Sequence, residues 1–189
     1  MGWYAVDTAS NPGMTTAQQE NNVNIIAAYF RTQGWTDNAI AAMLGNMQVE
    51  SFLNPCQFEM GQNYSMTSGF GLVQWTPATK YTSWAGFDWR TNYDKQLQRI
   101  IYELNNNLQW STIPINMSFY DFSRSTLSVD YLTEVFLRDY ENPLDWTASI
   151  ALRQSYANNW FTYLGNTPTP TGLPIWMLFK LRWNNGGKT

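Results

Sequence analysis

Residues 43–51 of the chain read MLGNMQVES, and they form the second half of a predicted helix that carries a glutamate in its last turn. Thr36 stands at the N-cap position of this helix, and Asn54-Pro55 marks its end. The apolar residues of the helix share one face at helical spacing: Ile40, Met43, Leu44 and Met47. Glu50 follows at the end of that apolar stripe, one turn after Met47. We therefore expect a carboxyl group that is partly removed from water.

Removal from water disfavours the charged form of a carboxyl group. Glu50 is then suited to hold a proton and to donate it to a leaving oxygen, as a general acid does. The alternative from the same spacing is a glutamate that points into solvent at a frayed helix end. The pattern of one helix leaves both interpretations open.

Apolar spacing and helix-stop residues predict five more helices. They run from a capping box at Thr16-Ala17-Gln18-Gln19 to Gly34, from Pro77 to about Trp84, from about Thr91 to Asn105, from about Ser128 to Asp139, and from Asp145 to Leu164. Residues 56–70 lack periodicity and predict a long loop or a small irregular hairpin. A short extended segment, Gly71 to Trp75, is expected to follow that loop.

The 189 residues suffice for one domain, which we expect to span residues 1–165. Residues 166–174 are rich in proline and threonine and predict a stiff linker. Residues 175–189 begin with an apolar patch that is too short to cross a bilayer. This tail is expected to dock on a partner protein or, alternatively, to pack back on its own domain.

Composition excludes several classes of function. The chain has no histidine, which rules out a Ser-His-Asp triad, a Cys-His pair and an HExxH zinc site, so acid chemistry must come from carboxyl groups. The net charge of −3 and the scattered basic residues argue against nucleic-acid binding. The single cysteine, Cys56, is expected to be a packed residue. No cofactor or metal is expected, and the N-terminus predicts no secretory signal peptide.

Two motifs in the right order narrow the function. Residues 43–51 with Asn54-Pro55, followed by Gly71-Leu72-Val73-Gln74-Trp75-Thr76-Pro77-Ala78-Thr79, resemble the Glu-Ser...Asn-Pro and Gly-Leu-x-Gln...Pro-Ala-Thr signatures of goose-type lysozymes and lytic transglycosylases. The fuller string from Gly34 to Trp75 more closely resembles the phage tail lysozymes. This resemblance extends over about residues 20–165.

The resemblance implies a mainly α, lysozyme-like (α+β) domain, with the long loop or hairpin flanking an active-site cleft. It implies a glycosidase that cuts the β-1,4 bond between N-acetylmuramic acid and N-acetylglucosamine in peptidoglycan, with Glu50 as the acid. By the same mapping Ser51 helps to orient Glu50, and Gln74 lines the sugar groove. A later stretch with Tyr140 and Glu141 resembles an aromatic-Glu-x-Pro segment of phage tail lysozymes and is expected near the groove.

Two aromatic side chains are candidates for contact with sugar rings in the groove. Trp75 and Tyr64 are sugar platforms or, equally, packing residues, and Glu141-Asn142-Pro143 also resembles a plain helix-stop turn.

A second carboxyl group is expected because most glycosidases use two. Glu59, Glu141 and Asp88 are the candidates. Hydrolysis is the preferred outcome, with a transglycosylase that leaves anhydro products as the alternative. A non-catalytic, glycan-binding structural component of a phage tail is the rival function.

Delivery on a phage tail would suit an acidic enzyme, because one placed mechanically at the wall needs no electrostatic attraction to it. The expected location is therefore the virion tail, and the expected partners are glycan strands and, through the C-terminal tail, a tail knob or tail tip protein.

Overall fold

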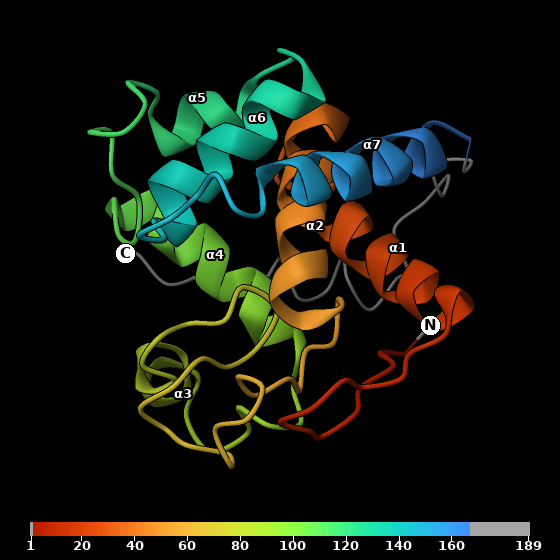
Figure 1. The fold of residues 1–189 in the computed structure, drawn as a ribbon, viewed down its shortest axis with the longest axis vertical. Coiled ribbons are helices and arrows are strands. Elements are labelled where there is room, and N and C mark those ends of the chain that lie inside the picture. The colour runs from red at the N-terminus through yellow and green to blue at the C-terminus, as the bar shows by residue number, and fades with distance from the viewer. Residues whose placement is uncertain (1, 167–189) are drawn as a thin grey trace, which may run out of the picture.

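A computed structural model describes residues 2–166, which fold into a mainly helical domain (Figure 1). Expectations for the linker and tail, residues 167–189, lie outside the described residues. The elements, in chain order, are α1 (Thr16–Thr32), α2 (Asp37–Ser51), α3 (Thr79–Ala85), α4 (Asp94–Asn106), α5 (Phe119–Arg124), α6 (Val129–Phe136), the π-helix η1 (Leu137–Glu141) and α7 (Ile150–Asn166). Within the described part of the chain, none of these helices is long and apolar enough to span a membrane.

Helix α2 runs through the middle of the domain and packs against α1, α5, α6 and α7 (Figure 1). Every residue from Ala39 to Gln48 is buried, and the helix packs mainly against α7 and α6. A helix without a polar face is typical of the interior of a protein, and α2 is such a helix. Glu50 lies in its last turn, where burial gives way to partial exposure.

Gly45 permits the close crossing of α2 and α7. A Cβ atom at Gly45 would lie 2.5 Å from the carbonyl oxygen of Arg153 and 2.6 Å from the Cβ of Ala157. Real Cβ atoms do not approach other atoms so closely, so any larger residue must push α7 away. The glycine therefore sets the distance between Glu50 on α2 and the side chains of α7.

The long non-helical segment between α2 and α3 lies on one side of the molecule, around α3 (Figure 1). Isolated bridges join Phe58 to Phe70 and Phe70 to Trp75, which confirms the predicted loop with hairpin-like pairing. The N-terminal segment is attached to this region by Asn54. The Asn54 side chain accepts a hydrogen bond from the Val6 N–H and donates one to the Val6 carbonyl. Gln96 of α4 clamps the same region, donating to the Pro55 carbonyl and accepting from the Leu72 N–H.

Several predicted elements differ from the structure in position. The capping box uses Thr15 and Gln18, one residue earlier than expected, because Thr15 keeps the extended backbone of an N-cap. The extended segment Gly71–Trp75 is wrong: Gly71 and Gln74 both have positive φ, which turns the chain tightly between Phe70 and Trp75.

The bounds of several helices also differ from those predicted. The third and fourth helices begin at Thr79 and Asp94, a few residues later than predicted. Asp145 caps a short turn at Thr147 and Ala148 instead of starting α7, which begins at Ile150. Helix α5 was not predicted at all, since its six residues are too few for periodicity.

Replacing Gly45 with alanine tests the α2–α7 crossing. Overpacking against backbone atoms should destabilise the domain by about 1–3 kcal/mol, despite the helix propensity that alanine adds, and lower Tm by several degrees in a thermal melt. Gly165→Ala is the matched control. Gly165 also lies in α7, but a Cβ atom there would meet nothing within 4 Å. Equal melting temperatures for the two variants would contradict the proposed close contact.

Candidate active site

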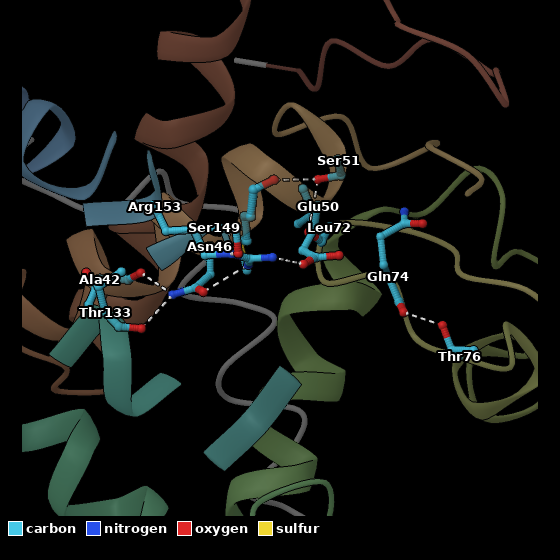
Figure 2. A network of polar contacts seen from close by, with 11 residues as sticks. Ala42, Asn46, Glu50, Ser51, Leu72, Gln74, Thr76, Thr133, Ser149 and Arg153 are labelled. Atoms are coloured by element: carbon cyan, nitrogen blue, oxygen red, sulfur yellow. Dashed lines mark hydrogen bonds and ion pairs between the residues drawn. The ribbon is translucent and has the colours of Figure 1, made fainter. Parts of the chain in front are cut away.

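The carboxylate of Glu50 forms an ion pair with an arginine of α7 (Figure 2). Its Oε1 atom lies 2.5 Å from Nη2 of Arg153, and the Arg153 side chain is only 7% exposed while that of Glu50 is 21% exposed. A buried guanidinium next to a carboxylate requires that carboxylate to be charged in this arrangement. Glu50 is thus anchored on the protein side and open on the other.

Arg153 is itself held in place by two polar contacts besides the ion pair with Glu50. Its Nε donates to the Ser149 hydroxyl at 3.0 Å and its Nη1 donates to Oδ1 of Asn46 at 3.0 Å. Asn46 in turn donates to the carbonyls of Ala42 and Thr133, which fixes the direction of its amide (Figure 2). Residues from α2, α6 and α7 therefore converge to orient one carboxylate.

Ser51 lies next to Glu50 in sequence but contacts other groups. It is fully buried, and its hydroxyl donates to the Met47 carbonyl at 3.0 Å and to the Leu72 carbonyl at 2.9 Å. Those bonds tie the end of α2 to the turn that follows Gly71 (Figure 2). The structure thus places Ser51 as a link between the two motifs.

Gln74 and Trp75 occupy the other side of that turn. Gln74 is half-buried, and its Nε2 donates to the carbonyls of Gln57 and Gly71. Trp75 is 1% exposed, stacks on Tyr81, and donates through Nε1 to Glu103. The faces of Trp75 are therefore covered by protein, and the structure places it in a supporting position beneath the turn.

The π-helix η1 brings a second group of acidic side chains to the interior. Its wider turn, closed by the bond from the Asn142 N–H to the Leu137 carbonyl, places Asp139 and Tyr140 inside the domain. Such single π-turns often occur at functional sites. Burial raises the pKa of Asp139 to about 6, and its Oδ1 accepts from the Ile115 N–H.

Tyr140 is buried and bonds to a carboxylate beneath the site. Its hydroxyl donates to Oε2 of Glu103 at 2.5 Å, and Oε1 of Glu103 accepts from Trp75 and Arg99. Burial raises the pKa of Glu103, and these three donors oppose that shift. The Glu103 carboxylate thereby joins Tyr140 to Trp75, two residues expected from the sequence to support the site.

Glu141 is an acidic residue on which the charge of Glu50 acts. As a residue it is partly exposed, but its Oε1 atom is buried and has no hydrogen-bond partner among residues 2–166. Burial raises the pKa of Glu141 well above its usual range, and the Glu50 charge raises it further, while Arg153 opposes the shift. Glu50, Glu141 and Arg153 therefore form one electrostatic cluster.

The other two candidates for a second carboxyl are engaged elsewhere. Glu59 accepts from the Gly69 N–H within the loop, and Asp88 pairs with Lys95 at the start of α4. Tyr64 is 49% exposed and donates to the Asp7 carbonyl, at the N-terminal segment. No cluster of potential metal ligands occurs within residues 2–166.

Three residues that hold the site together were not predicted from the sequence. They are Arg153, its partner Asn46, and Glu103. A signal for two of them is present in the sequence. Arg153 extends the buried stripe Ala157, Trp160 and Leu164 of α7 by one turn, and Glu103 extends the stripe Leu97 and Ile100 of α4. A charge on a buried helical face needs a partner of opposite charge or several donors, and each of these residues has one.

The sequence is similar to a known protein family and to a phage protein. The sequence model described as phage tail lysozyme matches residues 21–164. The chain is also 40% identical over 158 residues to "Morphogenesis protein 1" of Bacillus phage B103. That match covers 82% of this chain and 42% of the relative, so the chain spans about two fifths of the relative's length.

Proposed function

Because this chain belongs to the phage tail lysozyme family, we propose that it hydrolyses the β-1,4 bond between N-acetylmuramic acid and N-acetylglucosamine in peptidoglycan. The observation that carries the proposal is the position of Glu50 at the end of a buried helix. Its carboxylate is fixed by Arg153 on one side and remains 21% exposed. A group placed in this way can reach a glycosidic oxygen without losing its orientation.

The remaining residues have separate roles in this proposal. Glu50 donates the proton to the leaving oxygen, and Glu141 is the second carboxyl group of the site. Ser51 and Gln74 hold the turn that follows Gly71 in place beside Glu50. Trp75 and Tyr140 support it from below through Glu103.

Hydrolysis is preferred to a transglycosylase reaction because two carboxyl groups act on one another at this site. Hydrolysis needs one group to donate a proton and a group that takes a proton from water. In a transglycosylase the muramic 6-hydroxyl is the nucleophile, and the carboxylate that has just donated its proton can accept the hydroxyl proton, so one carboxyl group suffices. The reaction proposed here uses carboxyl groups and requires no cofactor.

Replacing Glu50 with glutamine tests the proposed acid. The amide cannot donate the proton, so the rate of release of soluble fragments from purified peptidoglycan should fall by at least about 100-fold. The far-ultraviolet circular dichroism spectrum should still be that of the folded protein, although the unpaired Arg153 should lower Tm. Glu134→Gln is a matched control, since Glu134 is also paired with an arginine, Arg138, and should retain activity.

Near-normal clearing by the Glu50→Gln protein would remove Glu50 from the mechanism. If neither the variant nor the unmodified protein cleared peptidoglycan, the rival function of a glycan-binding tail component would be supported instead.

Placement on the virion tail is part of the same proposal, supported by the family and by the phage source of the relative. Residues 175–189 are proposed to attach the domain to a tail knob or tail tip protein. Deleting residues 167–189 should then remove the protein from purified particles without lowering its activity on isolated cell wall. Particles that keep the shortened protein, as judged by immunoblotting, would contradict attachment through this segment.

A further inference from the structure

Glu50 has a property that a general acid must overcome. Its carboxylate is paired at 2.5 Å with a guanidinium that is 7% exposed and held by Ser149 and Asn46. An ion pair of this kind contains an ionised carboxylate. In the resting arrangement the proton needed for catalysis is therefore not on Glu50, and another group must hold it.

Glu141 is the group that fits this role. Its Oε1 atom is buried without a hydrogen-bond partner among the described residues, an arrangement that is costly for a carboxylate and much less so for a neutral acid. The charged groups that act on it are Glu50 from α2, Glu103 from α4 and Arg153 from α7. On its own element, Arg138 is occupied by Glu134, and Asp139 bonds the Ile115 N–H.

Two of the three groups that face Glu141 are carboxyl groups, and the one cation is engaged by Glu50. A second negative charge at Glu141 would thus face like charges with only one arginine to compensate them. Two carboxyl groups in such surroundings hold one proton between them. Glu103 is less able to accept that proton, because three donors already bind its two oxygens.

We propose that Glu141 stores the catalytic proton and that Glu50 and Glu141 act as a single acid that holds one proton, with Arg153 fixing which carboxyl group carries the charge. This assignment rests on the proposed hydrolysis for its catalytic meaning, but the sharing of a proton is a property of the free protein. It gives Glu141 a role beyond that of a second carboxyl near the groove.

The proton is conserved through the reaction. It moves from Glu141 to the Glu50 carboxylate, directly or through one water, and from Glu50 to the glycosidic oxygen as the bond from that oxygen to C1 of the muramic sugar breaks. The bonding electrons stay with the departing oxygen. A water then forms a bond to C1 and releases one proton to the carboxyl pair, which restores the resting state.

Carboxyl titration tests the proposal without using activity. The protein is labelled with ¹³C at the glutamate side-chain carboxyl carbon and titrated by NMR from acid to mildly alkaline pH, with Glu50→Gln and Glu141→Gln used to assign the signals. The Glu141 signal should remain that of a neutral acid at pH 6. In the Glu50→Gln protein its midpoint should fall by roughly one pH unit or more, because a neighbouring negative charge is lost.

The signal of Glu141 alone decides the outcome. The proposal is overturned if Glu141 in the unmodified protein titrates in the usual range of a glutamate, or if its midpoint ignores the Glu50 substitution. The unmodified protein alone can deliver the first of these results, even if Glu141→Gln does not fold.

The pH profile of peptidoglycan cleavage connects the pair to catalysis. In Glu141→Gln the alkaline limb of kcat/KM should move to lower pH by roughly one unit or more, whereas Glu134→Gln should leave it in place. A purely structural role for Glu141 would lower the rate equally at every pH, which would contradict proton storage. Failure of the unmodified protein to cleave peptidoglycan would refute the proposed function, while the titration would still decide whether the proton is shared.

Discussion

The orientation of the carboxylate at this site depends on the ion pair between Glu50 and Arg153. It joins α2 to α7 where Gly45 lets their backbones approach, and its arginine is 7% exposed. Breaking a buried pair by removing one partner leaves an uncompensated charge, which is strongly destabilising. The bonds from Arg153 to Asn46 and Ser149 therefore maintain both the fold and the direction of the carboxylate.

A buried carboxylate, that of Glu103, connects two further segments. Glu103 binds Trp75 and Tyr140, so the turn after Gly71 and the π-helix η1 are connected through one side chain. Ser51 connects the same turn to the end of α2. The two sequence motifs are thus held together by buried polar contacts, and the partly exposed face of Glu50 is the part left for a substrate.

Much of this arrangement could be predicted from local sequence. Thr36 caps α2 as expected, and Glu50 lies in its last turn, because capping and apolar spacing are local properties. The turn at Gly71 was mistaken for an extended segment, since Gln74 adopts a positive φ that a residue other than glycine rarely shows. Arg153 and Glu50 are 103 residues apart, and their partnership depends on the crossing of two helices, which spacing within one helix does not reveal.

Mass spectrometry of digested peptidoglycan tests hydrolysis at this site most directly. The account predicts muropeptides that carry a reducing-end hydroxyl on N-acetylmuramic acid, because water is the group that attacks C1. These products should be missing from digests with the Glu50→Gln protein. Products lighter by one water, with an anhydro-muramic end, would contradict hydrolysis and show that the muramic 6-hydroxyl is the nucleophile.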